Sequence, residues 1–297
     1  MLAARFIHNL AFAAVFVVFS FSAQAAANRT FVSTGGSDSN TSLNCGGTTP
    51  CRTFGAALSV TNSGGEIVVL TSGGYGPATI TEAVTITAVG VTASITATGG
   101  ADGLDINTSG NVTIRGLGFH GQGTGENGIL VSNVGALRLY NVIVENFSFV
   151  GIWFKASSGS LAIYDSHVSG NGNAGLGLST GSPSVYVKNT IFDYNEYGFA
   201  QVGGNVVVED SAAVGNSVAG FDNGGGSLSL VRDEAVWNGV GIVNRVGGST
   251  QFAYSNISQN TNYAINVMGG TISGSNLGTS VVSGTVSGSL STAVNLR

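Results

Sequence analysis

The stretch Ile163–Ser179, IYDSHVSGNGNAGLGLS, decides how the chain folds. Asp165, Ser166 and His167 stand side by side in it and are the three residue types of a hydrolytic triad. The same stretch alternates apolar and polar residues around turn formers, which is typical of short strands joined by corners. Whether it is an active site or one unit of a repeat depends on the rest of the chain.

The rest of the chain repeats this pattern at intervals of 21 to 25 residues. Most repeats have apolar residues two, four and nine places after their start. The starts are Gly110, Gly135, Gly159, Pro183, Gly204, Gly226, Gly248 and Gly270. A turn former stands six places on in most repeats, as Asn141, Asp165, Asn189 and Asp210. Asparagine stands twelve places on, as Asn171, Asn195, Asn216, Asn238 and Asn260, with Asn146 one place early.

Period-two alternation inside a period near 22 predicts an all-β fold, a single-stranded parallel β-helix with three short strands in each coil. A leucine-rich repeat would need a Leu-rich consensus, a propeller blade about twice the period, and a calcium-binding roll the motif GGxGxD. None of these is present. Asparagine tolerates left-handed backbone at corners, and we expect the recurrent Asn side chains to hydrogen-bond from coil to coil.

The repeat excludes the triad. Asp165 falls at a corner, Ser166 in an inward position shared with Val142, Thr190 and Ser211, and only His167 faces solvent. Side chains that diverge to corner, core and surface do not meet as a triad requires.

Residues 1–27 have the pattern of a signal peptide. Arg5 precedes an apolar run of about a dozen residues, and small residues at Ala23 and Ala25 suit cleavage near Ala25–Ala27. We therefore expect a secreted, periplasmic or cell-surface protein with no integral membrane segment after cleavage. Charged residues are 8% of the chain and no Lys/Arg-rich run occurs, so nucleic acid is not an expected partner.

Residues 28–62 are expected to form an N-terminal cap, and residues 63–297 the β-helix with a degenerate last coil from Thr271. Cys45 and Cys51 are the two cysteines, and in an exported chain they predict a disulfide. Cys51–Val60 has the spacing of a short amphipathic helix that Thr53 can cap. GGEIVVLTSGGYGPATITEAVTITAVG, residues 64–90, should then supply the first strands.

FVSTGGSDSN, PCRTFGAAL, GGEIVVLTSGGYGPATI and the repeats after Gly110 resemble exported β-helix proteins of the pectin lyase-like superfamily. The resemblance covers nearly all of the mature chain and implies right-handed winding. It says little about activity, because the superfamily includes lyases, hydrolases, epimerases, adhesins and uncharacterised proteins.

The superfamily's catalytic motifs are missing. There is no Asp-Asp, no His between glycines, no RxPxxR and no Asp-Pro-His segment. Asp38 is expected to be a polar turn residue rather than a calcium ligand, and neither a metal nor a cofactor is predicted. The pairs Asp233–Glu234 and Glu209–Asp210 are expected at solvated corners.

Three residues form a candidate catalytic cluster. Glu145 and Asp193 are predicted to face outward on the second strands of two coils that are two steps apart. The two carboxylates would then be about 9–10 Å apart. This is near the upper end of the spacing between the carboxylates of an inverting glycosidase. His167 lies between them and could tune a pKa or donate to a sugar hydroxyl. The alternative is a wet sheet face with scattered polar residues.

A second candidate is a stripe on the outward face of the first strand, one or two residues per coil. Aromatic rings with interleaved cations suit sugar rings and uronate carboxylates. The residues are Arg115, Arg138, Tyr140, Tyr164, Tyr186 and Lys188. The alternative is that stacked tyrosines stabilise neighbouring coils.

The sequence therefore favours an exported protein that contacts an acidic polysaccharide, with catalysis left open. Two other hypotheses remain: a non-catalytic surface or adhesion spacer, and a polysaccharide lyase, hydrolase or epimerase with an atypical site.

Overall fold

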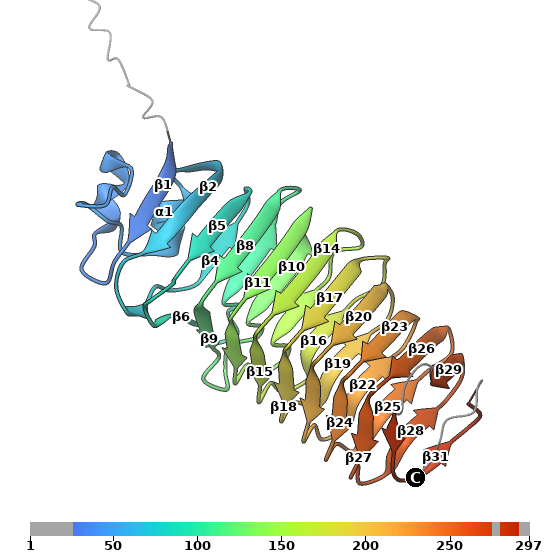
Figure 1. Cartoon of the computed structure of the whole chain (residues 1–297). Coiled ribbons are helices and arrows are strands. Elements are labelled where there is room, and N and C mark those ends of the chain that lie inside the picture. Colours follow the sequence, from blue (N-terminus) through green and yellow to red (C-terminus); the bar gives the residue numbers. More distant parts are fainter. Residues whose placement is uncertain (1–25, 275–279, 291–297) are drawn as a thin grey trace, which may run out of the picture.

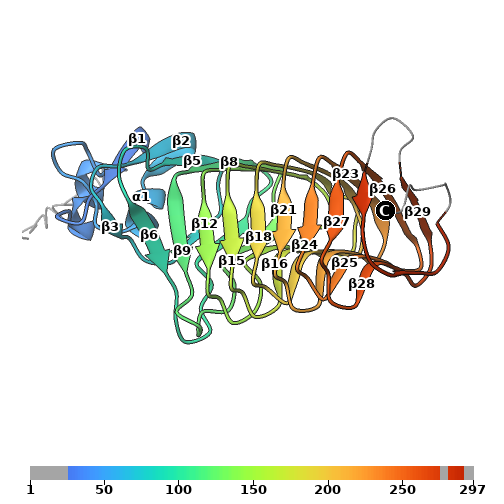
Figure 2. The ribbon, with the colours of Figure 1, turned by 60° about the horizontal axis from the view of Figure 1, so that its bottom comes forward.

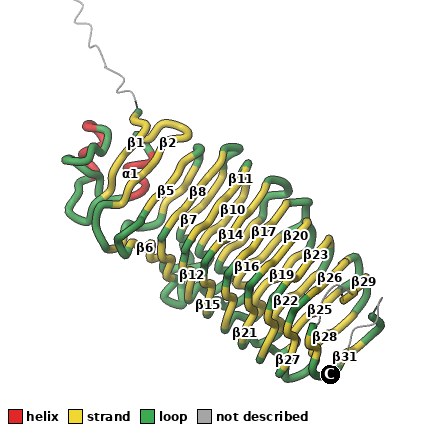
Figure 3. The backbone as a smooth tube through the Cα atoms, in the orientation of Figure 1, coloured by secondary structure: helices red, strands yellow, loops and turns green. Residues whose placement is uncertain are grey.

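The computed structural model describes residues 26–274 and 280–290. The predicted signal peptide up to residue 25 and residues 291–297 of the predicted last coil lie outside this range. In the described part the chain winds as an elongated coil whose strands stack in three parallel sheets (Figure 1). The fold is all-β with very little helix, as the repeat predicts (Figure 3).

Each coil contributes one strand to each sheet, in the order sheet A, sheet B, sheet C. Sheet A contains β1 (Ala27–Val32), β2 (Thr61–Val69), β5 (Val84–Thr87), β8 (Asn111–Arg115), β11 (Ala136–Tyr140), β14 (Ser160–Tyr164), β17 (Ser184–Lys188), β20 (Asn205–Glu209), β23 (Gly226–Val231), β26 (Gly248–Ala253) and β29 (Thr271–Gly274). Sheet B contains β3 (Gly73–Gly74), β6 (Ala93–Thr96), β9 (Leu117–His120), β12 (Ile143–Glu145), β15 (His167–Ser169), β18 (Ile191–Asp193), β21 (Ala212–Val214), β24 (Glu234–Val236), β27 (Asn256–Ser258) and β30 (Val281–Val282). Sheet C contains β4 (Ala78–Ile80), β7 (Leu104–Asn107), β10 (Ile129–Asn133), β13 (Ile152–Phe154), β16 (Ala174–Leu178), β19 (Tyr197–Gln201), β22 (Ala219–Asn223), β25 (Val240–Asn244), β28 (Tyr263–Val267) and β31 (Val286–Ser287).

The strands stack in the register that the repeat predicts. Leu137 pairs with Leu161, and Leu161 with Val185, and all three are buried. The apolar positions of each coil therefore form columns that fill the interior, and the residues between them form columns on the outer faces.

The corner between sheets A and B is a single residue in the left-handed region. Asn141, Asp165, Asn189 and Asp210 have φ between 49° and 52° there. Asn and Asp adopt this conformation at lower cost than other side chains, which explains why these residue types recur at this position.

The corner between sheets B and C contains the asparagine ladder. Asn171, Asn195, Asn216 and Asn238 are buried, and each donates from its backbone N and its Nδ2 to the Oδ1 of the next asparagine, at 2.9–3.3 Å. The predicted coil-to-coil hydrogen bonding is confirmed. The left-handed residue at this corner is the residue before the asparagine, not the asparagine itself.

The N-terminal end is closed by η1 (Asp38–Leu43) and α1 (Phe54–Leu58). A disulfide joins Cys45 to Cys51, as predicted. Thr53 Oγ1 accepts a hydrogen bond from Ala56 N at the start of α1. The expectation that the first strands follow residue 64 was wrong, because β1 already pairs with β2 in sheet A.

Asp38 has a structural role in this cap. Its carboxylate accepts hydrogen bonds from Arg52 N, Thr53 N and Thr53 Oγ1, at 2.9–3.0 Å. It thereby satisfies backbone donors just before α1.

Neither helix in the described residues is long and apolar enough to cross a membrane.

The solvated position expected for Asp233 was wrong. Asp233 is 1% exposed and occupies the inward column of Ser166 and Ser211, where its carboxylate accepts from Ser211 N and Val231 N. Burial raises the pKa of Asp233 to about 7. Its neighbour Glu234 is exposed.

Candidate functional site

The outer face of sheet A brings together the predicted aromatic and cationic side chains. Arg115, Tyr140, Tyr164 and Lys188 lie in register on successive strands β8, β11, β14 and β17. Arg138 and Tyr186 lie in the neighbouring column, separated by Ala162. We call these six residues the sheet A stripe.

Ring contacts run along the first half of the stripe. The guanidinium carbon of Arg115 lies 4.2 Å from the ring centre of Tyr140. Tyr140 stacks on Tyr164 with ring centres 5.0 Å apart and planes 7° apart. Tyr186 follows, 5.8 Å from Tyr164 and tilted by 54°. Parallel strands hold equivalent side chains at the coil spacing, which suits this stacking.

The second half of the stripe is an ionic network. The Tyr186 hydroxyl donates to Glu209 Oε2 at 2.7 Å, which raises the pKa of Tyr186 to about 12 and holds the pKa of Glu209 below its usual range. Lys188 Nζ lies 3.4 Å from Glu209 and 3.5 Å from Asp210. The charge of Lys188 is thus balanced by carboxylates on the next coil, whereas Arg138 is exposed beside the tyrosines.

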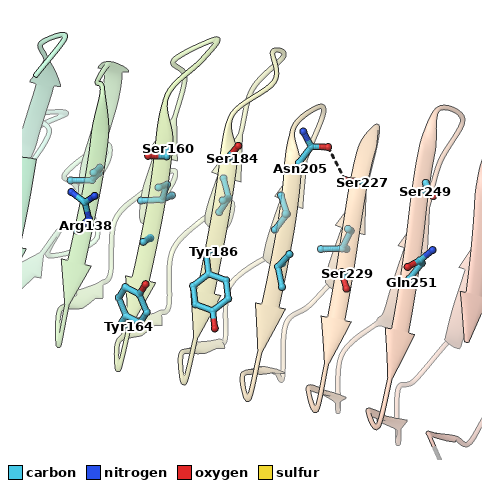
Figure 4. Close-up of a pocket in the computed structure, with 17 residues that line it drawn as sticks. Arg138, Ser160, Tyr164, Ser184, Tyr186, Asn205, Ser227, Ser229, Ser249 and Gln251 are labelled. Carbon is cyan, nitrogen blue, oxygen red and sulfur yellow. Dashed lines mark hydrogen bonds between the residues drawn. The ribbon is translucent and has the colours of Figure 1, made fainter. Parts of the chain in front are cut away.

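A groove of about 680 Å³ crosses this face, over six strands from β11 to β26 (Figure 4). Arg138, Tyr164 and Tyr186 line one end, and small or polar side chains line the other. Six strands span five coil steps, about 24 Å at the usual strand spacing. An extended chain lying across the strands would fit this length.

Sequence analysis missed the polar end of the groove. It is lined by Asn205, Ser227, Ser229, Ser249 and Gln251. These residues occupy outward positions of sheet A, so the repeat contained the signal. They give no functional signal in the sequence, because serine on a sheet face is common and carries no charge.

The candidate catalytic residues lie on the outer face of sheet B, where β9, β12, β15 and β18 run side by side (Figure 2). His167 Nε2 lies 2.8 Å from Asp193 Oδ1 on the next coil. Glu145 Oε1 lies instead 2.8 Å from His120 Nδ1 on the preceding coil. The cluster is therefore divided into two imidazole–carboxylate pairs, and His167 is turned toward one of its two expected neighbours.

Each pair can hold an imidazole in a fixed orientation and tautomer. Ser169 stands in register between Glu145 and Asp193, so the two carboxylates are on coils two steps apart, as the repeat predicts. Among the described residues no three or more His, Cys, Asp or Glu side chains are grouped as a metal site would require.

Among solved structures, the chain is similar to pectate lyase Pel9A, with 16% sequence identity and a TM-score of 0.61 over 81% of this chain and 78% of that chain. A rhamnogalacturonan lyase aligns with 11% identity and a TM-score of 0.35, over 82% and 84% of the two chains. At this identity the likeness to pectate lyase concerns the fold. No curated protein matches the chain.

The family comparison agrees with the stacked coils and their register. Residues 59–236, more than half of the sequence, match the model of the right-handed β-helix region. The chain belongs to the right-handed β-helix family.

Proposed function

We propose that the chain is an exported protein that binds an acidic polysaccharide along the outer face of sheet A, over the sheet A stripe and the groove beside it. The observation that carries the proposal is the continuous run of Arg115, Tyr140, Tyr164 and Tyr186, one residue per coil and in mutual contact. Aromatic faces repeated at the coil spacing suit an extended chain of sugar rings.

The charges around the groove favour an acidic ligand at its aromatic end. Arg138 is exposed there, and Arg115 lies against the ring of Tyr140. A guanidinium can donate two parallel hydrogen bonds to a uronate carboxylate. On the coil after Lys188, Glu209 and Asp210 repel an anion. The acidic sugars of the ligand should therefore lie beside Arg115 and Arg138, and its uncharged sugars should lie over the serines.

The proposed export rests on the N-terminal signal pattern and on the disulfide between Cys45 and Cys51. Pel9A is named for pectate, an acidic polysaccharide, which makes pectate the first probe to try. The sequence similarity is too low to transfer the activity itself.

Retention on immobilised pectate tests the proposal. The double variant Tyr140→Ala with Tyr164→Ala should weaken retention at least tenfold, since each ring contributes on the order of 1 kcal/mol. Retention of the wild type should also fall as salt is added, because salt screens exposed charges.

Tyr263→Ala is a matched control, because it removes a tyrosine from β28 in sheet C, away from the groove, and should leave pectate retention unchanged. Circular dichroism of each variant reports whether the β-helix is intact. If the wild type is not retained on any acidic polysaccharide at low ionic strength, the stripe stabilises neighbouring coils and the chain is a rigid spacer.

A catalytic function is a second candidate, and the pairing of His167 with Asp193 is the observation that favours it. An imidazole held by a carboxylate can transfer a proton during cleavage of a glycan. Incubation with pectate and other acidic polysaccharides, followed by detection of new chain ends, distinguishes a binding protein from an enzyme.

A further inference from the structure

A second surface feature lies on the corner after sheet B. The residues that follow β12, β15, β18, β21, β24 and β27 occupy one column, because the strands before them are in register. The corner follows the arrowheads of these strands in Figure 2. The column consists of Asn146, Gly170, Tyr194, Gly215, Trp237 and Gln259, all with φ between 57° and 64° except Tyr194 at 53°.

Two residues of this column are costly for the fold. Left-handed backbone suits glycine and asparagine, and it strains bulky side chains. Tyr194 and Trp237 adopt it all the same. Burial does not compensate the strain, since their exposed fractions are 71% and 62%. Each coil needs a left-handed residue at this corner, but a large exposed aromatic residue is a costly choice for it, and such strained positions cluster at functional sites.

The two aromatic side chains are arranged along the axis of the coil. Gly215 lies between them in the column, and a Cβ on Gly215 would come 3.1 Å from Tyr194 Cε1. The Tyr194 ring therefore leans over Gly215, toward the coil of Trp237. Two coil steps separate the two backbones, about 9.6 Å. Together Tyr194 and Trp237 form an exposed aromatic ledge.

We infer that the aromatic ledge binds a neutral, extended polysaccharide whose sugar rings stack on Tyr194 and Trp237. Rings two coils apart suit a chain in which alternate sugars present the same face. No residue of the column is charged. Asp193 directly precedes Tyr194, and its carboxylate disfavours an acidic chain. The ledge thus differs from the sheet A stripe in location and in ligand.

Cosedimentation with microcrystalline cellulose tests this inference. The wild type should sediment with the solid, and the bound fraction should persist at high salt, because stacking on uncharged rings is not screened. The double variant Tyr194→Asn with Trp237→Asn should lose at least tenfold in retention.

The same double variant should be more stable than the wild type, because asparagine relieves the strain at both corners. A rise in Tm of about 2–4 °C per relieved position is expected. Gln259→Asn, in the same column, should raise Tm and leave retention unchanged. Tyr194→Phe with Trp237→Phe keeps the rings and should keep the retention.

Four results would overturn the inference. Failure of the wild type to sediment with cellulose would do so, as would retention that survives in the asparagine variant. A fall in Tm for that variant would show that the two rings stabilise the fold. If sedimentation velocity shows that the wild type self-associates and the asparagine variant does not, the ledge is a contact between two copies of the chain.

Discussion

Replacing Asp233 by serine should stabilise the protein at neutral pH. Asp233 lies in an inward column whose other polar members carry hydroxyls, at Ser166, Thr190, Ser211 and Ser255. Ser211 Oγ accepts from Thr190 N and donates to the carbonyl of Glu209. Ser255 Oγ accepts from Asp233 N and donates to the carbonyl of Ala253. A serine at position 233 can repeat this pattern between Ser211 N and the carbonyl of Val231.

The magnitude follows from the pKa of Asp233, which burial raises from 3.8 to about 7. A pKa raised in the folded state means that the folded protein holds the proton more tightly than the unfolded chain. Its stabilising contribution is complete below pH 3.8 and is lost as pH rises through 7. At about 1.4 kcal/mol per pH unit, the loss is about 4 kcal/mol in total, of which about 3 kcal/mol falls between pH 5 and pH 8.

Denaturant unfolding of the wild type and of Asp233→Ser at pH 5, 6, 7 and 8 measures this contribution. The difference in unfolding free energy should grow in favour of the variant by about 2–3 kcal/mol across the range. Glu234→Ser, which removes the neighbouring exposed carboxylate, is the control and should follow the wild type. If Asp233→Ser and the wild type show parallel pH profiles, the carboxylate is not desolvated in the folded protein and the argument fails.

Four further substitutions test other parts of the structure. Asn216→Leu should lower the unfolding free energy by about 1–3 kcal/mol, because the buried donors of Asn195 lose their acceptor; an unchanged melting transition would contradict this. If polysaccharide cleavage is detected, Glu145→Gln and Asp193→Asn should each abolish it with the fold intact, and activity in both variants would exclude the sheet B site. Asp38→Ala should cost about 1 kcal/mol, measured by thermal unfolding, since Arg52 N and Thr53 N lose a shared acceptor.

The fold could be predicted from sequence because a β-helix repeats the same physical problem in every coil. Apolar side chains must fill the interior, and each corner needs a residue that accepts left-handed backbone. Both demands recur at fixed places, so aligned positions such as Leu137, Leu161 and Val185 are evident without a structure. The register followed from the same alignment, because coils stack residue on residue.

The errors came from positions where residue type and repeat position disagree. Asp233 has the position of Ser211 in the repeat but the chemistry of a surface residue, and the prediction followed its chemistry. The alignment was therefore the better guide at this position. No prediction was made for the backbone of Tyr194 and Trp237, since their side chains give no hint of the left-handed conformation at their corner positions.

The local pairing of side chains could not be predicted. Glu145 is next to His120 and diagonal to His167, and the choice between them depends on side-chain torsions that the repeat leaves free. The groove likewise depends on how far neighbouring side chains rise from sheet A. Arg138 and Tyr186 have longer side chains than residues such as Ser229. The depth of the groove depends on these differences across the assembled sheet face.

The asparagine ladder has a direction, and this gives the folding of the chain a direction too. The backbone N–H of each ladder asparagine donates toward the C-terminus, so a finished coil offers a donor that the next coil satisfies. The Nδ2 of Asn195, Asn216 and Asn238 also donates to a carbonyl of the preceding coil. The C-terminal end of the folded part is therefore a template for the following coil, whose asparagine accepts the free hydrogen bond. When that coil docks, its own asparagine presents the same donor to the coil after it. Because N-terminal segments leave the ribosome first, this polarity matches the order of synthesis, and assembly resembles the addition of subunits to one end of a filament.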